Sequence, residues 1–369
     1  MRGNITRRGK SSFLIRFDAE RINGKRRQRC VTIRGSYKDA QRELARLLAA
    51  ADAGTLPDPS SSTVAEYLRT WLDGLLGLSP KTLERYGELS ERQIIPHLGA
   101  TKLQKLKPEH VQSWHGALLK SGLSGRTVGH AHRVLRLVLQ CAVKNGTLAR
   151  NVAEIHSPPK VEETEIEILS PDQITDVLTK LEGHTLFPVV ALALATGIRR
   201  GELLGLQWGD IDLDAATLRV ERSVEETKSG LRIKPPKTKR GRRAITLPAE
   251  TVAMLRVHKV KQLELRLALS MGNIIPATLV FSTVEGKLIR PRNLSKAWWR
   301  ARAELKLPAV SFHAFRHSHA SALIRAKVDV LTISRRLGHA QASITLDVYG
   351  HLIEGADKAA ADPISTVLK

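Results

Sequence analysis

The stretch Thr196-Gly197-Ile198-Arg199-Arg200-Gly201-Glu202-Leu203-Leu204 places two adjacent arginines and a glutamate directly after an apolar segment. That apolar segment, which ends with Ala193 to Gly197, predicts a buried helix. Arg199 by itself would be interpreted as one half of a surface ion pair, because Glu202 lies three residues later on the same helix face. Its role therefore depends on the other groups that the chain supplies.

Further basic groups and one late tyrosine follow in the last 170 residues. Lys237 lies in the turn-like run Pro236-Lys237-Thr238-Lys239-Arg240-Gly241, between two predicted strands. His313-Ala314-Phe315-Arg316 opens a predicted helix whose spacing puts its histidine and its arginine on one side. Leu337-Gly338-His339 ends the next predicted helix, and Tyr349 follows ten residues later.

Together these groups are typical of phosphoryl transfer that works without a metal. Guanidinium groups stay charged and bind two phosphate oxygens through a planar fork. A tyrosine nucleophile stores the energy of the broken bond as a phosphotyrosine, so that a DNA strand can be resealed. A lysine or histidine can protonate the leaving 5′ oxygen.

The composition favours a nucleic-acid partner. The chain has 369 residues, with 59 Lys and Arg against 36 Asp and Glu, a formal charge of +23 and a pI of about 10.4. Hydrophobic residues make up 42%, which predicts folded domains. No apolar run is long enough to span a membrane, and no secretory signal is recognisable, so we expect a cytoplasmic, nucleoid-associated protein. Two cysteines are too few for a disulfide framework or a cysteine-based zinc site.

The first 53 residues carry 14 Lys and Arg against 5 Asp and Glu, a net charge of +9. Residues 13–17 and 28–33 read as strands, Asn23-Gly24 as a hairpin turn, and Ser36 with Asp39 as the capping box of a helix. A basic excess this local predicts DNA contact, although a solvated sheet face is the alternative. The candidate DNA-binding residues here are Arg7, Arg8, Arg16, Lys25, Arg26 and Arg27.

Residues 54–62 read as a linker, and a helical pattern follows to about Asn151. One predicted helical segment covers 82–95 and ends at Pro96, another starts at Pro108, and the longest stripe covers 128–142. DNA contact or ordinary solubilising surface would both explain the basic residues on the predicted exposed faces, which are Lys102, Lys105, Lys107, Arg126, His130, His132 and Arg133. We take Arg126 and Arg133 as the candidate DNA-binding residues of this part.

As an ordered set, the run from Thr196 to Leu204, the His313-x-x-Arg316 box, Leu337-Gly338-His339 and Tyr349 resemble the tyrosine recombinase (phage integrase) family. The resemblance implies a multidomain fold, mainly α with small β-sheets. Its expected parts are a small ββ(β)α arm-type DNA-binding module (1–55), an all-α SAM-like core-binding domain (62–155) and a mixed α/β catalytic domain with a C-terminal tail (168–369).

The resemblance also implies a role for each group. Tyr349 would be the nucleophile, Arg199 and Arg316 would clamp the scissile phosphate, and His339 would assist them. Lys237, on a β-hairpin turn, would protonate the 5′ oxygen, although Lys239 and Arg240 are nearby alternatives. His313 would act in proton transfer with Tyr349, and Glu202 would orient the site.

The expected function is site-specific recombination that integrates or excises a phage or other mobile element. The alternatives are a type IB topoisomerase and a non-catalytic DNA-binding regulator. The expected partner is double-stranded DNA at core and arm sites, bound by a homotetramer, with a DNA-bending protein and an excisionase as further candidates. No cofactor or metal is expected, because Arg316 stands between His313 and His317 and would repel a cation.

Overall fold

The computed structural model describes residues 3–22, 25–53, 56–57, 59–161, 166–236 and 239–350. The chain divides near residue 163 into two compact units, which are treated separately below. Three sequence-based expectations lie outside the described residues: the Asn23-Gly24 turn, the position of Lys237 and the tail beyond Gly350.

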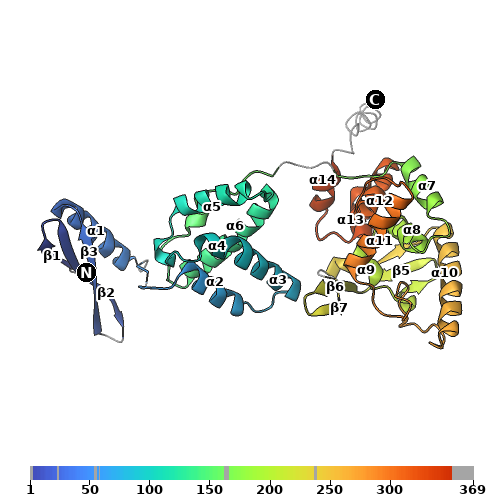
Figure 1. Cartoon of the computed structure of the whole chain (residues 1–369), viewed down its shortest axis with the longest axis horizontal. Coiled ribbons are helices and arrows are strands. Elements are labelled where there is room, and N and C mark those ends of the chain that lie inside the picture. Colours follow the sequence, from blue (N-terminus) through green and yellow to red (C-terminus); the bar gives the residue numbers. More distant parts are fainter. Residues whose placement is uncertain are drawn as a thin grey trace, which may run out of the picture. The chain divides into compact units, whose positions relative to one another are not determined.

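The first unit begins with an antiparallel sheet of order β1-β2-β3, followed by helix α1 (Figure 1). Ser36 and Asp39 form the predicted capping box of α1, and Ile15 and Phe17 are buried against its Leu47. The bounds are β1 (Gly3–Gly9), β2 (Ser12–Ile22), β3 (Lys25–Arg34) and α1 (Tyr37–Asp52).

The sequence pattern predicted two strands in this module, at 13–17 and 28–33, and did not predict strand β1. Its residues include a single large apolar side chain, Ile5, which is partly buried, and the other positions of the strand are mostly exposed. An edge strand with one apolar residue has no alternation for a sequence pattern to detect. Its pairing with β2, with Ile5 opposite Ile15, is decided by the neighbouring strand.

The rest of the first unit is helical and has its own core, which includes Leu68, Trp114, Leu135 and Leu139. Its helices are α2 (Val64–Asp73), α3 (Pro80–Leu89), α4 (Ile95–Leu98), α5 (Pro108–Lys120) and α6 (Gly125–Lys144).

Two expectations for these helices are wrong. Pro96 does not end a helix, because a π-helical turn, Ser90–Ile94, precedes it and Pro96 stands in the first turn of α4, where a missing N–H costs no hydrogen bond. His132 is not on an exposed face: it is buried, and its Nδ1 lies 3.1 Å from Nε2 of His115 on α5. This hydrogen-bond partner on the neighbouring helix compensates for the burial of the polar imidazole.

The second unit packs helices around two small antiparallel sheets, one of order β4-β5-β8 and one made of β6 and β7. The strands are β4 (Ile211–Asp212), β5 (Thr217–Val220), β6 (Ser223–Thr227), β7 (Gly230–Lys234) and β8 (Arg243–Thr246). The helices are α7 (Pro171–Lys180), α8 (Phe187–Thr196), α9 (Arg200–Leu204), α10 (Ala249–Ala268), α11 (Pro291–Glu304), α12 (Ala314–Arg325), α13 (Val330–Leu337) and α14 (Ser343–Tyr349).

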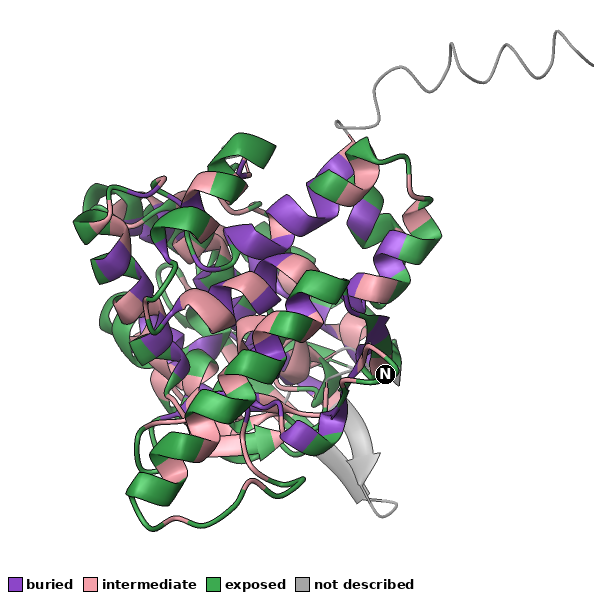
Figure 2. Ribbon diagram, turned by 90° about the vertical axis from the view of Figure 1, so that its right-hand side faces the viewer, coloured by how far each residue is buried: buried purple, intermediate pink, exposed green. Residues whose placement is uncertain are grey.

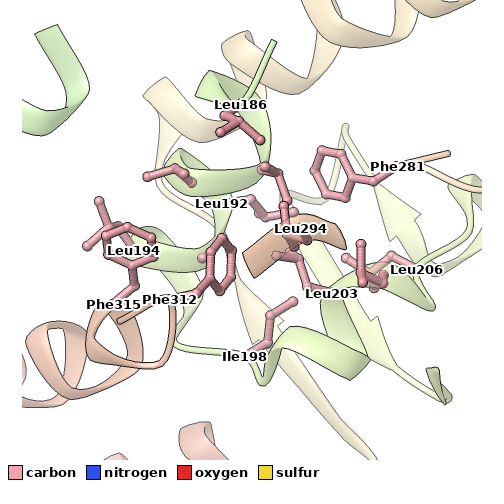
Figure 3. Close-up of a cluster of buried hydrophobic side chains, with 14 of the residues drawn as sticks. Leu186, Leu192, Leu194, Ile198, Leu203, Leu206, Phe281, Leu294, Phe312 and Phe315 are labelled. Carbon is pink, nitrogen blue, oxygen red and sulfur yellow. The ribbon is translucent and has the colours of Figure 1, made fainter. Parts of the chain in front are cut away.

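Helix α8 lies in the middle of this unit. Leu192 and Leu194 of α8 belong to the same buried cluster as Leu203, Leu294 and Phe315 from the surrounding elements (Figure 3). Several outer helices carry buried and exposed residues along the same ribbon, as amphipathic helices on a surface do (Figure 2). This core holds the ends of α8 and α12 in place, and α13 packs on α12.

Candidate active site

The end of α8 places Arg199. Gly197 ends the helix with a φ of +64°, and Arg199 then stands at the N-cap of α9. Glu202 accepts hydrogen bonds from the backbone N–H of Arg199, at 3.0 Å, and from its Nη1, at 2.8 Å. A side chain at Gly197 would meet the ring of His319, since an added Cβ would lie 2.7 Å from its Cδ2. The glycine therefore serves both the turn and the close packing of α12.

Arg316 comes from the first turn of α12 and is buried. Its Nη1 donates to the carbonyl of Gly197 and its Nη2 to the carbonyl of Leu337, both at 2.7 Å. Burial, followed by the charge of Arg199, lowers the pKa of Arg316 to about 9, so the guanidinium remains charged at pH 7. The ion pairs found among the described residues do not include Arg316.

The two arginines converge on the C-terminal end of α13. Arg199 donates from Nη2 to the carbonyl of Gly338, at 3.2 Å, next to the carbonyl of Leu337 that Arg316 uses. The two guanidinium groups lie on consecutive carbonyls, and the charge of Arg199 lowers the pKa of Arg316. Together they create a strongly positive site. Such a site favours an anion that can receive two planar forks.

His339 follows directly after this pair of carbonyls. Gly338 ends α13 with a φ of +67°, and the Nδ1 of His339 then lies 2.8 Å from Oγ1 of Thr345. Burial, and then the charges of Arg316 and Arg199, lower the pKa of His339 to about 4, so the ring is neutral at pH 7. A neutral imidazole can still donate one hydrogen bond to a phosphate oxygen.

Tyr349 ends α14 and is 1% exposed. Its hydroxyl lies 2.7 Å from Nδ1 of His317, which follows Arg316 on α12. Burial raises the pKa of Tyr349 to about 12. His313 is exposed at the N-cap of α12, and its ring stands edge-on to the ring of His317 with 4.8 Å between centroids. Sequence reasoning paired Tyr349 with His313, whereas the structure places His317 at its hydroxyl.

Glu202 connects Arg199 to the sheet. It is buried, and its Oε2 accepts a hydrogen bond from Nη2 of Arg243 at 3.0 Å. Burial raises the pKa of Glu202, but the guanidinium groups of Arg243 and Arg199 outweigh it and hold the pKa below the ordinary value. Arg243 was not among the expected site residues. The alternation of β8 could have found it, because Arg243 shares the inward face of the strand with the buried Ile245.

Lys237 lies outside the described residues, as does the side chain of Lys239. The strands on either side of Lys237 do not form the expected hairpin: β7 pairs with β6, and β8 pairs with β5. β7 and β8 therefore belong to different sheets. The remaining alternative, Arg240, is exposed and donates to the carbonyl of Ala340 at 2.7 Å.

Of the expected DNA-binding residues, Arg7, Arg8, Arg16, Arg126 and Arg133 are exposed. Arg16 pairs with Asn4 and Cys30 across the sheet, on the face opposite to Ile15 and Phe17. Arg7 pairs with Phe13, on the face that α1 covers, and bonds the carbonyls of Gly9 and Lys10. The expected arginines of this module therefore do not share one face. The side chains of Lys25, Arg26 and Arg27 lie outside what the structure describes.

Comparison with known proteins identifies the family of the chain. Residues 167–355 match the model of the phage integrase family, and residues 63–119 match the phage integrase N-terminal SAM-like domain. A tyrosine recombinase XerC-like protein from Caldanaerobacter subterraneus subsp. tengcongensis is 31% identical over 337 residues, covering 86% of each chain. The chain belongs to the phage integrase family. As a member of that family, the integrase is a tyrosine recombinase, an enzyme that cleaves and rejoins DNA strands. The match favours this activity over the topoisomerase and regulator alternatives.

Other relatives of the integrase include an integrase of Streptomyces ambofaciens, 31% identical over 86% of this chain and 84% of its own. Among solved structures, the Tn1549 transposon integrase in complex with transposon right end DNA has a TM-score of 0.73, at 19% identity, over 82% of this chain and 99% of that chain. A lambda integrase dimer bound to a COC′ core site has a TM-score of 0.59, at 17% identity, over 94% and 95% of the two chains. These structures show a shared fold.

The part of the integrase that the structure describes holds no helix long and apolar enough to cross a membrane. Within the same residues, no group of three or more His, Cys, Asp and Glu side chains could hold a metal ion.

Proposed function

We propose that the integrase acts on a DNA phosphodiester through Tyr349, which becomes linked to the 3′ phosphate, while Arg199 and Arg316 bind the non-bridging oxygens. One observation carries this proposal: the two guanidinium groups are held on the consecutive carbonyls of Leu337 and Gly338. Negative charge grows on the non-bridging oxygens of the phosphate in the transition state. The two guanidinium groups would bind and stabilise these oxygens. His339, neutral and beside the same carbonyls, would donate a further hydrogen bond.

The remaining roles rest on the family pattern. Lys237 would protonate the 5′ oxygen, His313 would take part in proton transfer, and Glu202 would orient Arg199. The biological result would be integration and excision of a phage or other mobile element by a homotetramer on core and arm DNA. The exposed Arg126 and Arg133 on α6 and the basic N-terminal module would contact that DNA. A DNA-bending protein and an excisionase would be further partners. The proposed location is the nucleoid of a bacterial host.

A nicked suicide duplex tests the nucleophile. The duplex carries the core site recovered from the junctions of the element that encodes the chain. A nick just 3′ of the scissile phosphate lets the short fragment that carries the released 5′ hydroxyl diffuse away. We expect a covalent protein–DNA adduct with the wild type. Tyr349→Phe should form none while it retains DNA affinity, because the ring keeps its packing and loses only the attacking oxygen.

Adduct formation by Tyr349→Phe at the wild-type rate would refute the assignment of Tyr349. Two differently labelled duplexes then test recombination: joined products from both duplexes are expected. Relaxation of supercoiled DNA without joined products would contradict the integrase role.

A further inference from the structure

The hydroxyl of Tyr349 has a partner that the family pattern did not assign. His317 lies on α12, directly after Arg316, and its Nδ1 is 2.7 Å from the Tyr349 oxygen. The phenol is 1% exposed, so water has little access to this oxygen. The oxygen that would attack the phosphate is therefore already in hydrogen-bond contact with a protein nitrogen.

The chemistry needs such a nitrogen. Burial raises the pKa of Tyr349 to about 12. At pH 7 a phenol of this kind is ionised in only about one molecule in 10⁵. Attack without a proton acceptor would depend on that small fraction, whereas an acceptor in contact removes the proton as the new bond forms.

The surroundings of His317 keep its imidazole neutral. Burial, and then the neighbouring charge of Arg316, lower its pKa below the ordinary value, and Glu167 opposes this shift. The groups that face it are Tyr349 of α14, His313 and Arg316 of α12, His339 after α13 and Glu167 before α7. A neutral ring with its Nδ1 lone pair toward Tyr349 can accept a proton near pH 7.

We propose that His317 is the general base of DNA cleavage. This inference rests on the proposed function, in which Tyr349 is the nucleophile. The Tyr349 oxygen forms its bond to phosphorus, the bond from phosphorus to the 5′ oxygen breaks, and the Tyr349 proton moves to Nδ1 of His317. The leaving 5′ oxygen takes its proton from a different group, for which Lys237 is the candidate. In rejoining, His317 returns its proton to Tyr349 as the phosphotyrosine bond breaks.

A purely structural role makes a different prediction. A buried phenol needs a hydrogen-bond partner, and any acceptor at this place would satisfy it. In His317→Asn the amide can occupy the position of Nδ1 and accept the same hydrogen bond, but it cannot carry the proton. A structural role predicts that this variant cleaves normally, whereas a general base predicts a slow variant.

The test measures single-turnover adduct formation on the suicide duplex from pH 5 to pH 9. The wild-type rate should rise with pH through the pKa of His317, since only the neutral ring accepts a proton, and this limb should lie below pH 6.5, the ordinary pKa of histidine. His317→Asn should be about 10²-fold slower or more and should lose that limb. Its DNA affinity and thermal unfolding should match those of the wild type. His313→Asn tests the other histidine of α12, to which the family pattern gives a role in proton transfer: it should slow cleavage but keep the limb. Arg325→Gln, at an exposed position at the end of the same helix, is the control and should keep both the wild-type rate and the limb.

A second substrate separates the base from the acid. A duplex with sulfur at the 5′ bridging position has a leaving group that needs no proton. Lys237→Ala should recover on this duplex, whereas His317→Asn should stay slow, because its missing step is at the nucleophile. The assignment would be overturned if His317→Asn cleaved at the wild-type rate or recovered on the sulfur substrate. It would also be overturned if His313→Asn lost the limb while His317→Asn kept it. Absence of any adduct with the wild type would instead refute the proposed function.

Discussion

Arg243 joins three parts of the catalytic unit through one guanidinium. Its Nε donates to the carbonyl of Arg336 at 2.6 Å, its Nη1 to the carbonyl of Gly241 at 3.0 Å, and its Nη2 to Glu202 at 3.0 Å. The side chains of Arg243 and Glu202 are 6% and 3% exposed. Arg243 thus positions Glu202, and through it Arg199.

Removing Arg243 should leave a buried, poorly compensated carboxylate. Arg243→Met should lower the free energy of unfolding by roughly 3–5 kcal/mol, the usual cost of removing one partner of a buried ion pair. Denaturant unfolding measures this. The double variant Arg243→Met/Glu202→Gln should lose less than the sum of the single variants, because no buried carboxylate is left without its partner.

The neighbouring Arg242 is the matched control for that measurement. Its side chain is 62% exposed and its Nε lies 3.6 Å from Glu221. Arg242→Met should change the free energy of unfolding by less than about 1 kcal/mol, as exposed ion pairs usually do. Equal losses for Arg242→Met and Arg243→Met would contradict the role assigned to Arg243.

At the scale of elements, the end of α8 decides where Arg199 stands. Gly197 has a φ of +64°, and a Cβ there would lie 2.7 Å from the His319 ring and 2.9 Å from Leu337. Gly197→Ala should cost roughly 1–2 kcal/mol for the left-handed backbone and a further 1–3 kcal/mol for the clash. Because the same shift would displace Arg199, adduct formation should fall as well.

Gly183 separates backbone strain from crowding. Its φ is +78°, and a Cβ there would meet nothing within 4 Å. Gly183→Ala should therefore show only the backbone cost, of roughly 1–2 kcal/mol in denaturant unfolding. If both alanine variants lost the same stability, packing against His319 and Leu337 would not be the reason for the glycine at 197.

The sequence predicted most helices because their signals are local. Ser36 with Asp39 caps α1, Pro108 starts α5, and Gly197 and Gly338 end α8 and α13 as their positions indicate. Strand pairing was predicted less well. β6 and β7 form a short hairpin with Thr227 opposite Gly230, whereas β8 pairs with β5, which lies before that hairpin in the chain. The residues around Lys237 carry no local signal for this long-range pairing.

For the whole molecule, the charge of +23 is distributed unevenly, with +9 in the first 53 residues. Deleting residues 1–53 should weaken binding to element-end DNA and leave cleavage of a short core duplex largely unchanged. The dependence of log affinity on log salt should also become shallower, since each phosphate contact contributes a slope of about −0.9. Titration of both DNAs at several salt concentrations measures this. An unchanged ratio of the two affinities would contradict a separate arm contact.

The sequence by itself determined the family of this integrase, through the ordered set of Arg199, Arg316, His339 and Tyr349, and it also determined the basic composition and the ends of several helices. Such features depend on residue type and short spacing. Only the tertiary structure decided that His317 holds the Tyr349 hydroxyl and that Arg243 supports Glu202. These contacts join residues 32 and 41 positions apart in the chain. Their geometry follows from how α12, α14 and β8 pack on the core, which no local pattern contains.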